Sequence, residues 1–155
     1  MTEDGSPPGT APFATDREAL DLLDQFREGS LPKAAFTHRA HLMVGLWFLD
    51  HHSEAEARAL VPAAIKRFND RVGTVPKPRG GYHETITQFY LSMIARFRHR
   101  WRGEASFATR ANALHDELED RALPLRHYSE ALLWSEEARA RWVAPDLAPI
   151  DERSP

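Results

Sequence analysis

The chain has 155 residues, no cysteine and a formal net charge of −3, and 42% of its residues are hydrophobic. This length and composition are typical of one domain that buries a core without disulfides, and the missing cysteines exclude thiolate metal ligands and cysteine nucleophiles. The weak acidity does not favour nucleic-acid binding. Because there is neither a signal-peptide pattern nor an apolar run of about 18 residues, we expect a cytoplasmic protein with no membrane partner.

Apolar residues recur at intervals of three and four along most of the chain, which is the pattern of amphipathic helices. Thr15, Thr37 and Ser53 are suited to cap helices, Pro62 is expected to kink or break one, and Ser135 marks a second expected break. Helices are predicted over 16–28, 37–51, 53–72, 83–102, 106–121 and 129–143.

The domain boundaries follow from composition. Residues 1–14 are rich in proline, glycine and small polar residues and are expected to form a disordered tail. Residues 73–81 hold two prolines and three glycines and form the clearest loop. Residues 15–150 are therefore expected to be a single-domain, all-α bundle of five to six helices with short loops, followed by a flexible tail at 151–155.

Two short histidine clusters, residues 37–41 (THRAH) and 81–85 (GYHET), are the strongest signals. His38 and His41 are three residues apart and therefore lie on one face of their helix. His83 starts a later helix and is also expected to face inward. Because a buried imidazole without a partner costs about 1–3 kcal/mol, the three rings are expected to share one.

A metal ion is the partner that three convergent histidines favour. His38, His41 and His83 would bind one divalent ion and leave a coordination position open, as catalytic sites do. Zn, Fe, Cu, Ni and Mn all accept imidazole and carboxylate ligands, and the sequence does not choose among them.

The residues around this site suggest its chemistry. Glu84 is expected to act as a further ligand or as a general base on metal-bound water. Tyr82 and Thr87 complete the candidate catalytic set, and Thr87 is expected to hydrogen-bond His83. Tyr90 and Trp47 are expected to shape the pocket. This predicts hydrolase or lyase chemistry on a small molecule, with oxygen chemistry at Fe or Cu as the nearest alternative.

The remaining histidines carry weaker signals. His115 flanks an inner stripe and is a spare candidate for a fourth ligand or a proton shuttle, and His127 could line a pocket mouth. His51, His52 and His99 are suited to helix ends, where an imidazolium is favourable.

The strings FTHRAHL (36–42) and GYHETIT (81–87) resemble a family of small, mostly bacterial proteins that have no established activity. The strings WSEEAR (134–139) and PDL (145–147) are similar to its C-terminal pattern, so the resemblance spans about 15–150. It implies that both histidine clusters belong to one unit. The matching positions are His38, His41, His83, Glu84 and Thr87.

Two other classes of function stay open on the sequence. In one, the protein is a non-enzymatic helical module with structural histidines and a cavity for an organic ligand. In the other, it is an interaction protein that forms a homodimer through Trp101, Trp134 and Trp142.

Overall fold

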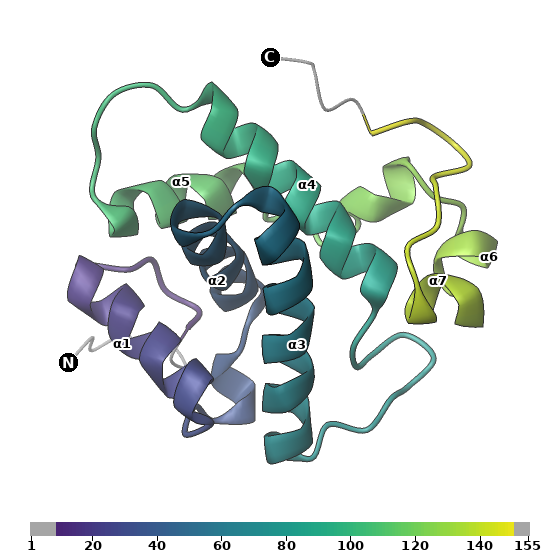
Figure 1. The fold of residues 1–155 in the computed structure, drawn as a ribbon, viewed down its shortest axis with the longest axis horizontal. Coiled ribbons are helices and arrows are strands. Elements are labelled where there is room, and N and C mark those ends of the chain that lie inside the picture. The colour runs from purple at the N-terminus through teal and green to yellow at the C-terminus, as the bar shows by residue number, and fades with distance from the viewer. Residues whose placement is uncertain (1–8, 151–155) are drawn as a thin grey trace.

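The computed structural model describes residues 9–150, and within that range the chain forms seven helices and no strand. Two are short, and they follow the 3-10 turn η2; another 3-10 turn, η1, precedes the second helix (Figure 1). The prediction of an all-α single-domain bundle is confirmed. The elements are α1 (Asp16–Glu28), η1 (Lys33–Ala35), α2 (His38–His51), α3 (Glu54–Val72), α4 (Glu84–Arg100), α5 (Phe107–Leu118), η2 (Leu123–Arg126), α6 (Glu130–Leu133) and α7 (Glu136–Ala140).

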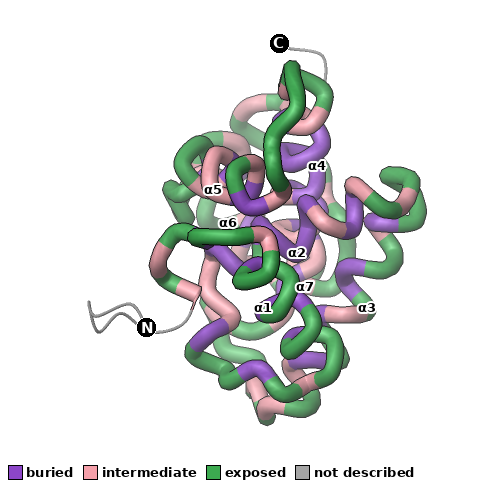
Figure 2. The backbone as a smooth tube through the Cα atoms, turned by 90° about the vertical axis from the view of Figure 1, so that its left-hand side faces the viewer, coloured by how far each residue is buried: buried purple, intermediate pink, exposed green. Residues whose placement is uncertain are grey.

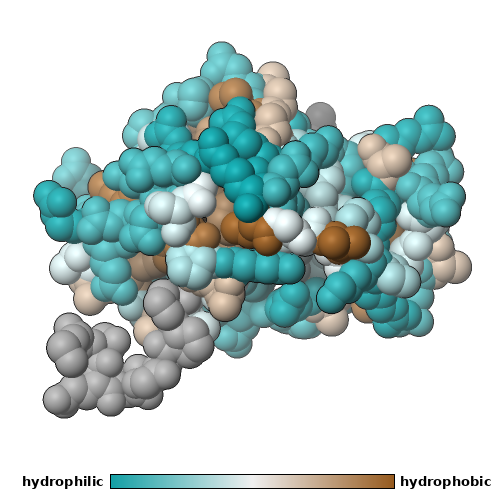
Figure 3. Space-filling model, turned by 90° about the horizontal axis from the view of Figure 1, so that it is seen from below, coloured by the Kyte–Doolittle hydropathy of each residue, from teal (hydrophilic) through white to brown (hydrophobic). Residues whose placement is uncertain are grey.

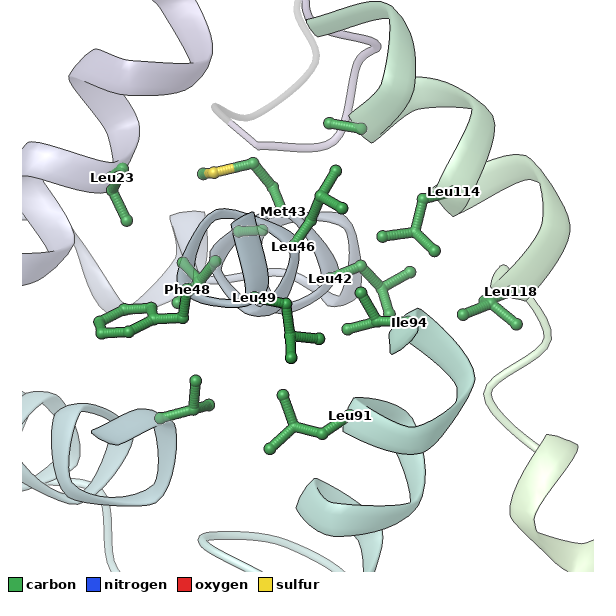
Figure 4. Packing of buried hydrophobic residues seen from close by; sticks show 14 of the residues in the cluster. Leu23, Leu42, Met43, Leu46, Phe48, Leu49, Leu91, Ile94, Leu114 and Leu118 are labelled. Atoms are coloured by element: carbon green, nitrogen blue, oxygen red, sulfur yellow. The ribbon is translucent and has the colours of Figure 1, made fainter. Parts of the chain in front are cut away.

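Helix α2 is the centre of the bundle, and α1, α3, α4 and α5 all contact it. It is apolar on almost every side, and Met43, Val44 and Leu46 are fully buried. Figure 4 shows Leu23 of α1 and Leu114 of α5 approaching it from different directions. A helix that is hydrophobic all round must be covered all round, so the sequence of α2 dictates its central place.

Side-chain caps set the start of the long helices. Thr15, Thr37 and Ser53 each accept a hydrogen bond from the backbone N–H three residues on, which confirms their predicted role. The predicted break near Ser135 also occurs, since α6 ends at Leu133 and Ser135 caps the start of α7.

Of the kink or break predicted at Pro62, the break does not occur, since α3 runs unbroken through this residue. Proline removes the N–H that would bond the carbonyl four residues back, which belongs to Arg58. Gln88 of α4 supplies the missing donor, with its Nε2 2.9 Å from that carbonyl oxygen. The Arg58 guanidinium bonds in return to Gln88 Oε1 and to Ser92 Oγ. Helices α3 and α4 are thereby joined at the weak point of α3.

The predicted N-terminal tail extends too far. Phe13 is 4% exposed, and its backbone N–H and C=O both bond the Asn112 side chain, so this part of the segment is fixed on α5. Residues 1–8 and the predicted C-terminal tail at 151–155 lie outside the described residues.

Buried positions gather on the inward-facing turns and exposed positions on the outer ones (Figure 2). The face in Figure 3 is largely hydrophilic, with separate hydrophobic patches between the polar side chains. No helix in the described range is long and apolar enough to cross a membrane.

Candidate functional site

A cavity of about 530 Å³ lies between α2, α3, α4 and the loop that leads into α4. Small-molecule sites occupy roughly 300–1,000 Å³, so the cavity can hold an organic ligand. All three predicted metal ligands, His38, His41 and His83, line it, together with Tyr82 and Thr87. The structure therefore places both histidine clusters on one cavity, as the sequence predicts.

The clusters meet because α2 and α4 both begin at this cavity. Thr37 caps α2 and His83 caps α4, and both residues lie on the cavity wall. The N-terminus of a helix carries a partial positive charge and unpaired N–H groups, so both helix starts favour a negative charge nearby.

The rings of His38 and His41 each have one nitrogen fixed by a backbone carbonyl. His38 Nε2–H donates to the Leu118 oxygen at 2.8 Å, and His41 Nδ1–H donates to the Thr37 oxygen at 2.8 Å. The other nitrogen of each ring has no hydrogen-bond partner within residues 9–150. Both rings therefore present a lone pair.

Both rings are held in the neutral form. Burial lowers the pKa of His38, and the nearby Arg121 charge lowers it further. Desolvation by the surrounding protein atoms lowers the pKa of His41 to about 4, with His38 and Arg121 adding to the effect. The His41 side chain is nevertheless exposed, because it borders the open cavity, and its ring stacks on Phe36 at 3.7 Å between centroids.

His83 differs because the backbone engages both of its nitrogens. Its Nε2–H donates to the Leu133 oxygen at 2.6 Å, and its Nδ1 accepts the Ile86 N–H at 3.1 Å. The ring edge also packs on Trp134. Burial lowers the pKa of His83, which favours the neutral ring that both bonds need. In this arrangement the ring has no free lone pair for a metal ion.

The three residues predicted to be catalytic are held in local bonds. Glu84 accepts hydrogen bonds from the Tyr82 hydroxyl and from Gln88, and it is not among the residues that line the cavity. Burial and the Glu84 charge raise the pKa of Tyr82. Thr87 forms the expected hydrogen bond to His83, since its Oγ1 donates to the His83 backbone oxygen at 2.8 Å.

The other predicted site residues lie apart, with one exception. Tyr90 lines the cavity, whereas Trp47 stacks on His51 outside it. His115 lies beside His38, at 6.1 Å between ring centroids, but it does not line the cavity, and its buried Nδ1 has no partner in the described part of the chain. His127 donates through Nδ1 to the Ala148 oxygen.

Within residues 9–150, no three or more His, Asp or Glu side chains form a group that could hold a metal ion. The three-histidine metal site therefore stays a prediction.

The cavity also holds positively charged side chains that the sequence did not single out. Four permanently charged side chains line the cavity, and its wall includes no aspartate or glutamate within the described range. They come from separated parts of the chain, so no motif joins them. They are Lys33, Arg79, Arg121 and Arg139.

Arg139 braces the loop at the cavity rim. Its guanidinium donates to four backbone oxygens of this loop, at 2.6–3.0 Å, and so fixes the segment that delivers His83 to the start of α4. Gly81 allows the final turn, since its φ is +80° and a Cβ there would lie 3.1 Å from the Pro76 Cα. The four oxygens belong to Lys77, Pro78, Gly80 and Tyr82.

Comparisons of the chain with protein-family models, with curated proteins and with solved structures find no match.

Proposed function

We propose that this protein binds a small organic anion in the cavity between α2, α3 and α4. The observation that carries this proposal is the charge of the wall, which holds four permanent cations and no carboxylate among the residues described. The whole chain is slightly acidic, so the excess of positive charge is local to the cavity. Apolar walls around clustered charges of one sign concentrate their field on a ligand.

The four cations are not equally available. Arg139 is occupied by the loop carbonyls, and Arg79 lies over the Trp134 ring and 3.8 Å from a Glu130 oxygen. The side chains of Lys33 and Arg121 have no hydrogen bond or ion pair within residues 9–150. The rings of His38 and His41 are neutral and cannot neutralise the charge of an anion. Arg121 is therefore the main candidate to hold the anion at the end of the cavity where these two rings lie.

Isothermal titration calorimetry with acetate, benzoate and inorganic phosphate tests the proposal. We expect at least one of them to bind, and Arg121→Gln to weaken it roughly 10- to 100-fold, because a charge-assisted hydrogen bond contributes about 1.5–3 kcal/mol. Arg17→Gln on the exposed side of α1 removes the same charge far from the cavity and should leave binding unchanged. No binding of any anion, or equal loss in both variants, would refute the proposal.

A second candidate function is metal-dependent catalysis at His38 and His41. It is supported by the two free ring nitrogens, because a metal ligand must be a neutral imidazole with an available lone pair. Hydrolase or lyase chemistry would then use water activated by the ion. The cationic wall opposes a divalent ion unless an anionic substrate binds with it.

Elemental analysis of protein purified without a histidine tag tests this second candidate. A bound first-row metal that is lost in both His38→Ala and His41→Ala would support it. Retention in His83→Ala would show that the pair suffices, and loss there would restore the three-histidine site. Metal-free wild-type protein that takes up none of these ions on dialysis would eliminate it.

A further inference from the structure

The cavity changes in character from its rim to its floor. Lys33, Arg79 and Arg121 at the rim are exposed, whereas the buried part of the wall is mostly apolar, with aliphatic side chains from α2, α3 and α4 and the Phe68 ring of α3. Leu42 of α2 and Leu91 of α4 are 1% and 2% exposed. A ligand that fills the cavity therefore meets charge at one end and hydrocarbon at the other.

Helix α3 completes the apolar floor. Val61 and Ile65 lie one turn apart, both line the cavity, and both are buried. A wholly polar anion would have to leave its water shell to lie against this surface, which is unfavourable without compensating hydrogen bonds. A hydrocarbon body instead gains about 0.8 kcal/mol for each methylene that it buries there.

The position of Arg121 sets the anionic end. It lines the cavity together with Thr37, His38 and His41, and it follows Leu118, whose carbonyl oxygen accepts the His38 Nε2–H bond, so it lies near the start of α2. The planar guanidinium matches a carboxylate with two parallel hydrogen bonds. A singly charged carboxylate also costs less to desolvate beside the apolar floor than a doubly charged phosphate does.

We infer that the ligand is a monocarboxylic acid with an extended apolar body, held with its carboxylate at Arg121 and its body between α2, α3 and α4. This inference rests on the proposed function, because it names the class of anion that the same cavity takes.

Titration of the wild-type protein with acetate, hexanoate and decanoate, each kept below its micelle concentration, tests the inference directly. We expect the affinity to rise by up to about fourfold for each added methylene. Decan-1-ol should bind more weakly than decanoate, and Arg121→Gln should reduce the affinity for decanoate while leaving that for decan-1-ol unchanged.

A variant of the floor locates the apolar body. Val61→Phe enlarges a side chain on α3 that lines the cavity, and it should weaken decanoate at least tenfold while acetate binds as before. A far-ultraviolet circular dichroism spectrum and a thermal melt establish that this variant folds. If it does not fold, the chain-length series on the wild-type protein decides the question without it.

The outcomes separate the two proposals. If no anion binds, the proposed function fails. If acetate or phosphate binds as tightly as decanoate, the proposed function stands and the apolar-acid inference is overturned. Tighter binding of decyl phosphate than of decanoate would overturn the carboxylate assignment.

Discussion

His83 fixes the geometry of the site by using both of its ring nitrogens. One accepts the Ile86 N–H and caps α4, and the other donates to the Leu133 oxygen at the end of α6. A helix start and a distant segment are thereby tied through one buried side chain. This explains why a histidine, rather than serine or threonine, caps this helix: neither of those side chains is long enough to make both bonds.

Replacement of His83 by alanine should therefore lower the free energy of unfolding by more than the loss of an ordinary helix cap does. Loss of the cap costs about 1 kcal/mol, and a buried carbonyl without a donor costs about 1–3 kcal/mol, so we expect unfolding to be easier by about 2–4 kcal/mol. Urea denaturation measures this change in the free energy of unfolding. His83→Asn, which can still cap the helix, should recover part of the loss, and His99→Ala on the exposed surface should change little. A loss for His83→Ala no greater than that for His99→Ala would contradict this role.

The histidines also show what single residues reveal in a sequence. Helix periodicity places His38, His41 and His83 on inward faces at two predicted helix starts, and they share one cavity because α2 and α4 begin at the same place in the fold. Their hydrogen bonds do not, because the acceptors belong to Leu118, Thr37 and Leu133, and two of these lie far along the chain. A backbone carbonyl leaves no mark in a sequence, so a shared metal ion was the simplest partner to predict.

At the scale of elements, α3 depends on α4 at Pro62. Gln88→Leu removes the donor that satisfies the Arg58 carbonyl, and we expect it to lower the free energy of unfolding by about 1–3 kcal/mol. Pro62→Ala restores the backbone N–H within the helix, so the same Gln88→Leu change should cost less in that background. Urea denaturation of the four proteins in this double-mutant cycle measures the difference. Strictly additive effects would show that the carbonyl does not couple the two residues.

The loop before α4 depends in the same way on α7. Arg139→Lys keeps the charge but presents a single ammonium group where the guanidinium spans four carbonyls. We expect faster amide hydrogen exchange over residues 76–82 with little change in α2, as measured by mass spectrometry. Arg141→Lys, which alters an exposed arginine nearby, is the matched control. Unchanged exchange in the loop would mean that its own turns hold it.

The elements themselves were largely predictable, and their junctions were less so. Periodicity and caps predicted α1, α2 and α3 to within a residue or two, because these signals are local. The turns η1 and η2 were missed, and α5 ends at Leu118, earlier than the predicted 121. The helix break at Pro62 was predicted wrongly because the signal that prevents it is not local: the donor to the Arg58 carbonyl is Gln88, on another helix.

For the molecule as a whole, the same helices that build the core make the cavity. Asp50 of α2 forms ion pairs with Arg98 of α4 and Arg110 of α5 and so joins three helices at the end of α2 away from the cavity. These hydrogen bonds and charges lower the pKa of Asp50 despite its burial. The cationic cavity wall could not be predicted from the sequence, because its four cations come from η1, the loop before α4, the segment after α5 and α7, which meet only in the folded chain.

The free energy of unfolding of the whole molecule should decrease as the solution becomes acidic. The histidines should cause the first part of this decrease. Burial lowers the pKa values of His38, His41 and His83 in the folded protein, and that of His41 reaches about 4. Below an unfolded pKa of about 6.5, the unfolded chain therefore binds protons that the folded chain does not, and the free energy of unfolding decreases with falling pH.

Asp50 extends this loss to lower pH. Its folded pKa lies below the value in the unfolded chain, so its contribution is complete near neutrality and disappears as pH falls through the folded pKa. Urea midpoints measured from about pH 7.5 to about pH 4.5 should decline steadily as the pH falls, because the histidines of the unfolded chain take up protons in this range. The decline should be shallower in His41→Gln. It should be unchanged in Asp50→Asn, because the Asp50 carboxylate that this variant removes titrates below the range measured. A midpoint that stays constant down to about pH 5 would show that the histidine pKa values are not lowered in the folded protein.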